Sequence, residues 1–404
     1  MRNNWQLAAF WALAVVAAIA IGLVYRIWFP NPVDLAVYRA GGTMLLEGTD
    51  LYGPRDGLPF TYAPFAALVF VPLAAIPWPT AVVTLTAISV LALGRALWLL
   101  LANLWDNQAH LARFLVVVAA ALITEPMIST ITFGQVNAIL LWLVMEDVFG
   151  KRASKIGGVL TGIAAGIKLT PGIFLLLYLV VGSWRRFLFG IAAFVVTVVI
   201  AWPFVGNAVV DFWTDVTWQV SRIGNPEFST NQSLNGLLWR LAGPDPSRVI
   251  WLLGAVVVVG AAMWVGRLQW QSNRLMAVAA TGLAMLLASP ISWSHHWVWA
   301  FPAFVALVAI ARRRMFATVW IGVGLLIMIF WVPMLPPSGE QVEFGWNLWQ
   351  VLLGNSYVIW AVVSLAYLTV LAARGQLPIS RSAAWERTSA EVGASLRTRA
   401  GGQG

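Results

Sequence analysis

An acidic, a phenolic and a cationic side chain lie close together in the segment NPVDLAVYRAGG, residues 31–42, directly after the first long apolar run. If residues 34–39 are helical, Asp34 and Tyr38 are four residues apart and share one face, with Arg39 beside them. A carboxylate next to a phenol and a guanidinium at a membrane surface suits acid–base or phosphate chemistry. In a purely structural interpretation, Asp34 caps a short amphipathic helix and Arg39 forms an ion pair with it.

Two of the three histidines are adjacent, His295 and His296, in the segment SPISWSHHWVW. An imidazole at the membrane surface can hydrogen-bond a phosphate or relay a proton. The structural alternative is a pair packed among the neighbouring tryptophans. We favour a functional role because histidine is otherwise almost absent from the chain.

Lys168 is the only charged residue of an apolar segment and lies one turn before Pro171. A buried ammonium needs an anion, either a carboxylate such as Glu125 or the phosphate of a ligand. Snorkelling of the lysine to the interface is the alternative, and structural pairing is the favoured role of Glu125. The amides Gln135 and Asn137 could bind sugar hydroxyls or cap a helix.

The composition indicates that these candidate side chains belong to a membrane protein. The chain has 404 residues, of which 60% are hydrophobic and 10% charged, and its mean hydropathy is +0.80. Soluble domains carry roughly 25% charged residues, so we expect an all-α polytopic membrane protein. The net charge of +9 is dispersed over short loops, which argues against nucleic-acid binding. The absence of cysteine and the three histidines make thiolate and multi-histidine metal sites improbable.

Basic residues on short loops mark the cytoplasmic side of a membrane protein, and their distribution here places both termini there. Both ends on one side require an even number of crossings, so one apolar run between residues 62 and 149 must fail to span. We estimate about twelve crossings. The thirteen candidate spans are 5–28, 62–77, 80–103, 111–124, 127–149, 156–169, 171–182, 187–205, 248–266, 275–289, 297–311, 315–333 and 353–373.

The runs 156–169 and 171–182 are each too short to cross comfortably, and both outer ends are basic. A hairpin of two half-helices, broken in the segment KLTP at residues 168–171, accounts for length and charge together. Non-helical backbone at that depth must be buried in protein or line a water-filled cavity.

Three long segments then face the extracytoplasmic side: 29–61, 206–247 and 334–352. They are rich in Pro, Gly, Asn and Asp, and the first two are long enough to contain short interfacial helices. Residues 374–404 are rich in Arg, Ser and Gly, which predicts a disordered cytoplasmic tail. Nucleotide-binding loops, the HExxH motif and the nucleophile elbow do not occur, so ATP-driven transport has no local support.

Seven segments in this order resemble a known family: VDLAVYRAGG, GTDLY, FTYAPFAAL, TFGQVNAILLWL, GIAAGIKLTPGIFLL, NQSLNGLLWRL and SPISWSHHWVW. Each segment alone is weak evidence for a family, but the set covers most of the membrane region. Together they resemble glycosyltransferase family 87, which are polyprenol-phosphate-mannose-dependent mannosyltransferases of the GT-C class.

The resemblance implies a GT-C catalytic domain over residues 1–373 in the plasma membrane, with its active site on the extracytoplasmic face. The implied reaction is inverting transfer from polyprenyl-phosphate-mannose to the 2-hydroxyl of a mannosylated phosphatidylinositol, with membrane lipids as surroundings. Many GT-C enzymes carry a pair of acidic residues near the first loop, but Asp50 and Asp56 are not spaced to pair with Asp34, so we predict no metal and no cofactor besides the lipid-linked donor. Asp34 is then the catalytic base.

The same resemblance assigns the remaining candidates to two groups. The donor phosphate would be bound by His296 first, and then by His295, Lys168 and Arg39. The contacts to sugar and acceptor would come from Tyr38, Tyr62, Gln135, Asn137, Asn231, Gln232 and Glu125.

Two alternatives stay open. The same fold can transfer another polyprenyl-phosphate sugar, such as arabinofuranose or glucose. A flippase for lipid-linked sugars, or another secondary transporter, is compatible with broken spans around Lys168.

Overall fold

The computed structural model describes residues 4–54, 56–102, 104 and 110–378. Within these ranges all regular structure is helical, and the only β-type pairing is an isolated bridge between Asn231 and Trp293. The predicted all-α class is therefore confirmed. Most of the predicted cytoplasmic tail, residues 379–404, lies outside the described residues.

The helices fall into three sets by length and type. Those of 15 residues or more are α1 (Asn4–Trp28), α2 (Val33–Glu47), α4 (Trp78–Leu101), α11 (Trp184–Val205), α14 (Arg248–Gln269), α15 (Arg274–Ala288), α17 (Met315–Ile329) and α19 (Ser356–Ala373). The shorter α-helices are α3 (Pro64–Ala75), α5 (His110–Leu122), α6 (Glu125–Phe133), α7 (Asn137–Phe149), α8 (Ala153–Ile156), α9 (Val159–Ile167), α10 (Ile173–Val180), α12 (Ala208–Thr214), α13 (Leu234–Ala242), α16 (Phe301–Ala311) and α18 (Leu348–Gly354). The 3-10 helices are η1 (Thr170–Gly172), η2 (Val216–Trp218), η3 (Val220–Arg222), η4 (Ser294–Ala300), η5 (Val332–Met334) and η6 (Val342–Gly345).

Several helices are long and apolar enough to cross a membrane. In the described part of the chain five meet this condition, or up to seven if each bent helix pair counts as one span. The bends are 99° between α1 and α2 and 67° between α5 and α6. Helices α3 and α5 have only 12 and 13 residues, well short of the roughly 20 that a bilayer requires. About twelve crossings therefore remains a prediction.

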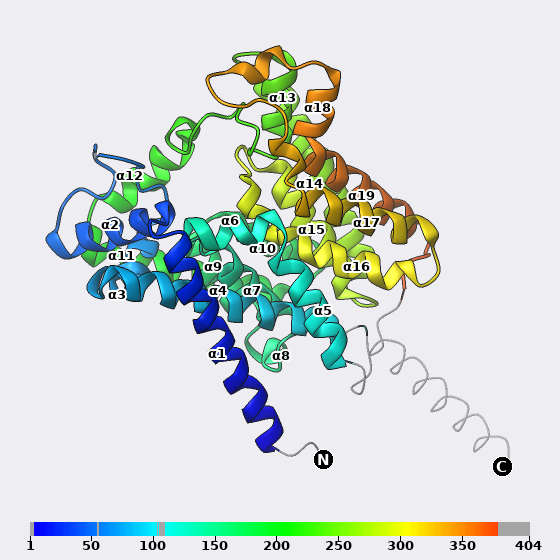
Figure 1. Cartoon of the computed structure of the whole chain (residues 1–404), viewed down its shortest axis with the longest axis horizontal. Helices are drawn as coiled ribbons and strands as arrows, with labels where there is room; N and C mark the ends of the chain where they lie inside the picture. Colours follow the sequence, from blue (N-terminus) through cyan, green and yellow to red (C-terminus); the bar gives the residue numbers. More distant parts are fainter. Residues whose placement is uncertain (1–3, 55, 103, 105–109, 379–404) are drawn as a thin grey trace.

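The helices form two groups that meet at the centre of the molecule (Figure 1). In the first, α1 packs on α4, α4 on α7 and α9 on α11; in the second, α14 packs on α15 and α19, and α15 on α16. The 3-10 helix η4 precedes α16 directly but packs against α6 and α7 of the first group. The two groups are therefore joined through η4.

Each segment predicted to be extracytoplasmic contains a short helix: α2 in 29–61, α12 and α13 in 206–247, and α18 in 334–352. In Figure 1, α13 and α18 lie at the top and α12 and α2 at the left, while α1 extends away from all four to the lower side. The three segments thus gather on one side of the molecule. Their position at a membrane interface stays a prediction.

The predicted break at Lys168 is present. Helix α9 ends at Ile167, Lys168 is extended (φ −143°, ψ 125°), and η1 follows from Thr170 with Pro171 inside it. Proline lacks the N–H that would continue α9 and disfavours helical backbone in the residue before it. The chain therefore leaves the helix at the one lysine of this segment.

Close packing of α9 on α11 depends on small residues. Gly162 faces Gly190, and a Cβ added at Gly162 would lie 2.1 Å from the carbonyl oxygen of Gly190. Small residues such as Gly162 and Gly190 at a helix–helix contact allow the two backbones to approach closely. The position of α9, and with it that of Lys168, rests on this contact.

We expect Gly162→Ala to lower the melting temperature of the protein in detergent. The added methyl group must separate α9 from α11, and overpacking of this kind costs about 1–3 kcal/mol. Gly260→Ala on α14 is the matched control, because a Cβ there meets no atom within 4 Å and alanine favours the helix. Equal melting temperatures for both variants would contradict the packing role of Gly162.

Candidate functional site

A cavity of about 750 Å³ opens between the two helix groups. Its wall is built from α2, the segment before α3, the α6–α7 junction, the break after α9, the η2–η3 segment and the α15–η4 loop. This volume lies within the range of roughly 300–1,000 Å³ that small-molecule and cofactor sites have. The segments are far apart in the sequence, so only the folded chain forms the cavity.

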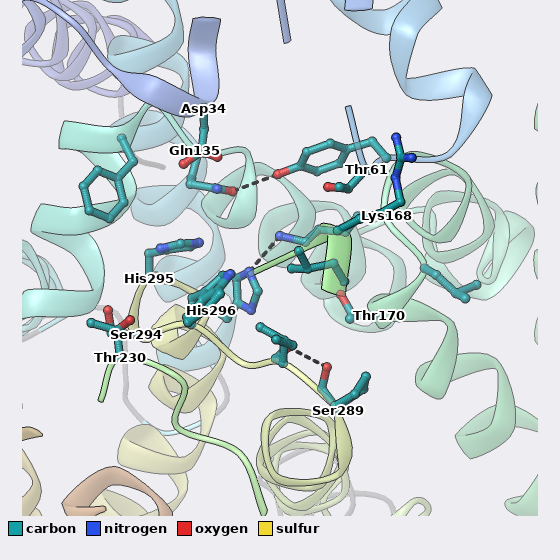
Figure 2. Close-up of a pocket in the computed structure, with 18 of the residues that line it drawn as sticks. Asp34, Thr61, Gln135, Lys168, Thr170, Thr230, Ser289, Ser294, His295 and His296 are labelled. Carbon is teal, nitrogen blue, oxygen red and sulfur yellow. Dashed lines mark hydrogen bonds between the residues drawn. The ribbon is translucent and has the colours of Figure 1, made fainter. Parts of the chain in front are cut away.

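Seven of the twelve predicted site residues line this cavity. They are Asp34, Tyr62, Glu125, Gln135, Lys168, His295 and His296. Figure 2 shows Asp34 and Gln135 on one side of the space, with Lys168 and the two histidines on the other.

Asp34 lies in the first turn of α2, where a tight turn brings Gln135 to it. Gly134 ends α6 in the left-handed conformation (φ 71°), and a Cβ there would lie 2.8 Å from the Cβ of Leu35. This contact brings Gln135 beside α2, where it hydrogen-bonds the Asp34 carboxylate. The Oε1 atom of Gln135 accepts a 3.0 Å hydrogen bond from the Tyr38 hydroxyl, which leaves the amide NH2 to donate to the carboxylate.

Two tyrosines fix the orientation of Gln135. The hydroxyls of Tyr38 and Tyr62 lie 3.0 Å apart, and the Tyr62 hydroxyl is also 3.4 Å from the Gln135 amide oxygen. Tyr38 is fully buried and stacks on Phe70 at 4.1 Å between ring centroids. Tyr38 therefore lies behind the cavity wall, whereas Tyr62 is part of it.

The Asp34 carboxyl is a weaker acid than an exposed aspartate. Asp34 belongs to α2, which turns by 99° from α1 and by itself is not long enough to span a bilayer. Burial raises the pKa of Asp34 to about 6, and the hydrogen bond from Gln135 and the positive charge of Lys168 oppose this shift. A carboxylate of this basicity is still ionised at neutral pH and is better suited to accept a proton.

On the other side of the cavity, Lys168 connects the α6–α7 junction to the histidine pair. Its Nζ donates to Oδ1 of Asn137 at 3.1 Å and contacts Nε2 of His296 at 2.9 Å, and it lies 5.4 Å from the Tyr62 ring centroid. An ammonium has three hydrogens and no acceptor. Nε2 of His296 therefore accepts, the neutral imidazole carries its hydrogen on Nδ1, and the lysine keeps a third N–H for the cavity.

The backbone of the histidine pair is anchored from the α6–α7 junction. The carbonyl oxygen of His295 accepts from the Thr130 hydroxyl at 3.0 Å and from the Asn137 amide at 3.1 Å. Asn137 is thus occupied on both sides, by Lys168 and by His295, and does not line the cavity. The Nε2 atom of His295 is buried without a partner among the described residues, although the residue lines the cavity.

Glu125 does not pair with Lys168. Its carboxylate accepts hydrogen bonds from Ser129 at 2.6 Å, from Tyr357 at 2.9 Å and from Ser294. These bonds tie α6 to α19 and η4, and the residue is fully buried. The sequence could not show this choice, because Tyr357 lies 232 residues from Glu125.

Arg39 corrects the grouping that the sequence suggested. Five residues after Asp34, it is rotated by about 140° around the helix, and its guanidinium donates to the carbonyls of Leu73 and Ile76. It lies above the Trp78 ring, 5.6 Å from the centroid. The last carbonyls of a helix lack intrahelical partners, so Arg39 caps α3 and lies neither beside Asp34 nor in the cavity wall.

Asn231 and Gln232 also lie outside the cavity wall. Asn231 accepts from the Ser292 backbone at 2.9 Å and donates to the Pro226 carbonyl at 2.8 Å. The Gln232 amide donates to the carbonyls of Ser229 and Gly354, both at 2.6 Å. Both side chains fix loop backbone where the sequence analysis expected sugar contacts.

Several polar residues of the cavity wall escaped the sequence analysis. They are Thr61, Thr170, Thr217, Gln219, Arg222, Thr230, Ser289 and Ser294. One signal existed for Arg222: it lies in a segment predicted to face away from the side where basic residues gather. The hydroxyl residues carry no such signal.

Comparison with known proteins identifies the family. The model of glycosyltransferase family 87 matches residues 60–290. The chain belongs to this family. The match contains the α6–α7 junction and Lys168.

Three similar relatives cover nearly the whole chain. The polyprenol-phosphate-mannose-dependent alpha-(1-2)-phosphatidylinositol mannoside mannosyltransferase of Mycobacterium tuberculosis is 32% identical, over 90% of this chain and 91% of its own. Its counterpart in Mycolicibacterium smegmatis is 33% identical, over 88% and 87%. A polyprenol-phosphate-mannose-dependent alpha-(1-2)-phosphatidylinositol pentamannoside mannosyltransferase of Mycobacterium tuberculosis is 32% identical, over 88% and 86%.

No metal centre is evident in the part of the chain that the structure describes. Groups of three or more His, Asp or Glu side chains placed to hold an ion are absent there. That the reaction needs no metal remains a prediction from the sequence.

We expect Arg39→Gln to lower the melting temperature while leaving the transfer activity per folded molecule nearly unchanged. The variant loses charge-assisted hydrogen bonds to two carbonyls, each worth about 1.5–3 kcal/mol, but nothing that lines the cavity. Thermal unfolding in detergent and a transfer assay measure the two effects. An Arg39→Gln variant of normal stability but greatly reduced activity would show that Arg39 belongs to the functional site.

Proposed function

We propose that this protein transfers mannose from polyprenyl-phosphate-mannose to the 2-hydroxyl of a mannosylated phosphatidylinositol, with inversion at the anomeric carbon. The observation that carries the proposal is the Asp34 carboxylate facing the Lys168 ammonium across one cavity in a member of family 87. The printed functions of the three relatives support the donor and the acceptor.

In the proposed reaction Asp34 is the general base. Its carboxylate takes the proton of the acceptor hydroxyl while that oxygen attacks C1 of the donor mannose. The bond between C1 and the phosphate oxygen breaks on the opposite face, so a β-linked donor gives an α-linked product. The place of Asp34 in the cavity wall and its pKa of about 6 support this role.

Lys168 stabilises the leaving phosphate. As the proton reaches Asp34, negative charge disappears from the carboxylate and appears on polyprenyl phosphate. The ammonium, held by Asn137 and His296, interacts with both groups and needs no rearrangement between them. A phosphate monoester has a second pKa of about 6, so the leaving group needs no general acid at neutral pH.

The two histidines add hydrogen-bond donors beside Lys168. His296 carries its hydrogen on Nδ1 when neutral, because Nε2 accepts from the lysine. The partnerless Nε2 of His295 can donate to a phosphate or sugar oxygen when its tautomer places the hydrogen there. Of the predicted sugar contacts in the wall, Tyr62 and Gln135 keep this role, whereas the Glu125 carboxylate is bound by Ser129, Ser294 and Tyr357.

Apolar parts of the cavity wall suit lipid. Phe133, Ile173, Trp293 and Trp331 contribute apolar side chains to the wall, and these can cover the first units of a polyprenyl chain. We place the site on the extracytoplasmic face of the plasma membrane, with both termini cytoplasmic and about twelve crossings. The gathering of the three long segments on one side of the molecule supports this orientation (Figure 1).

The test is a transfer assay with purified protein, polyprenyl-phosphate-mannose and phosphatidylinositol dimannoside, analysed for a new 1→2-linked mannose. The wild-type protein should form this product, and Asp34→Asn should reduce kcat by about 10²–10⁴-fold because the base is lost. The matched control is Asp211→Asn, which changes an exposed aspartate on α12. Near-normal turnover by a folded Asp34→Asn variant would exclude Asp34 as the base.

The pH profile gives a second test. Only ionised Asp34 can accept a proton, so kcat/KM should fall tenfold per pH unit below about pH 6. Lys168→Met removes a positive charge that lowers the pKa of Asp34, so the acidic limb should move to higher pH and the rate should also fall. An acidic limb at the same pH in both proteins would show that Lys168 does not act on the base.

A further inference from the structure

We propose that Arg222 binds the phosphodiester of the acceptor lipid, at a position separate from the donor phosphate. This inference rests on the proposed function and extends it to the second substrate. Arg222 ends η3 in the segment between α12 and α13 and lines the same cavity as Asp34 and Lys168.

The guanidinium of Arg222 has hydrogen-bonding capacity that the protein leaves unused. One Nη2 hydrogen bond, of 2.9 Å, goes to the carbonyl of Tyr52. The Nε atom is buried and has no partner among the described residues. A guanidinium has five N–H groups arranged to bind phosphate in a bidentate manner, so an unpaired buried N–H at the cavity wall indicates an anionic ligand.

The protein holds Arg222 in place through the first loop. Tyr52, which accepts its hydrogen bond, donates from its own hydroxyl to the Tyr62 carbonyl at 2.8 Å and stacks on Phe212 at 5.5 Å. Arg222 is therefore connected to Tyr62 of the cavity wall. An arginine positioned in this way loses little conformational entropy on binding a ligand.

The neighbouring side chains give this part of the wall polar groups beside the apolar Phe212, Val216 and Ile223. Thr217 and Gln219 come from the same short segment as Arg222, and Thr61 comes from the first loop. Hydroxyl and amide groups of this kind suit the hydroxyls of an inositol or mannose ring. The segment thus combines a cation for phosphate with donors and acceptors for sugar.

The charges of the two substrates match the two cations of the cavity wall, Lys168 with the donor lipid and Arg222 with the acceptor lipid. Each proposed substrate carries one phosphodiester with a single negative charge, and the basic side chains that the cavity wall presents besides histidine are Lys168 and Arg222 within the described residues. Lys168 interacts with Asp34, so it suits the donor phosphate, which is bonded to the reacting carbon. The acceptor phosphate is separated from the reacting hydroxyl by the inositol and at least one mannose, and so needs a cation elsewhere in the wall.

The experiment measures KM for each substrate in the purified full-length protein, comparing wild type with Arg222→Gln. We expect KM for phosphatidylinositol dimannoside to rise about 10- to 100-fold, as for the loss of a hydrogen bond to a charged group, while KM for polyprenyl-phosphate-mannose is unchanged. An octyl dimannoside has the reacting hydroxyl but no phosphate, so both proteins should use it equally well. Arg222→Lys, which keeps the charge, should restore part of the acceptor affinity.

The possible results separate the alternatives. A rise in the donor KM would assign Arg222 to the donor phosphate, and an equal loss with both acceptors would show a merely structural role through Tyr52. Unchanged constants would also overturn the inference. Arg248→Gln, an exposed arginine outside the cavity wall, controls for the loss of a positive charge. If the wild-type protein formed no product with phosphatidylinositol mannosides of any mannose number, the proposed function would fail, whereas an active wild type with an unaltered variant would reject Arg222 alone.

Discussion

A cation in an apolar interior is the constraint around which this structure is organised. Lys168 lies where α9 stops, and its ammonium is compensated by Asn137, by His296 and by the charge of Asp34. A buried charge without such partners would cost several kcal/mol. Helix α9, the α6–α7 junction, η4 and α2 must therefore meet at one point, and the cavity lies where they meet.

The sequence predicted the features that local patterns determine. Long apolar runs and the low charge predicted a helical membrane protein. Two runs too short to cross, with basic outer ends, predicted the break in the α9–α10 region. The same reasoning brought Asp34, Lys168 and the histidine pair to one side of the membrane, and the structure places them around one cavity. Their chemical roles follow from the family and from the proposed reaction.

Predictions that depended on distant contacts were less reliable. Arg39 was grouped with Asp34 from its proximity in the chain, but the helical rotation turns it to the end of α3. Glu125 accepts a hydrogen bond from Tyr357, which lies far along the sequence. Asn231 and Gln232 hydrogen-bond loop backbone. Polar side chains in a membrane protein can satisfy backbone groups instead of binding ligands, and composition alone does not separate the two uses. The number of crossings depends on helix tilt and packing, which run length does not fix.

The electrostatic interaction between Asp34 and Lys168 also bears on how the site returns to its starting state. After one proposed transfer, the carboxyl is neutral and the ammonium is bound to the spent polyprenyl phosphate. Loss of the proton from Asp34 restores its charge, which competes with the phosphate for the same lysine. In the proposed mechanism, release of the used carrier lipid is thereby linked to loss of the proton from Asp34 into the cavity.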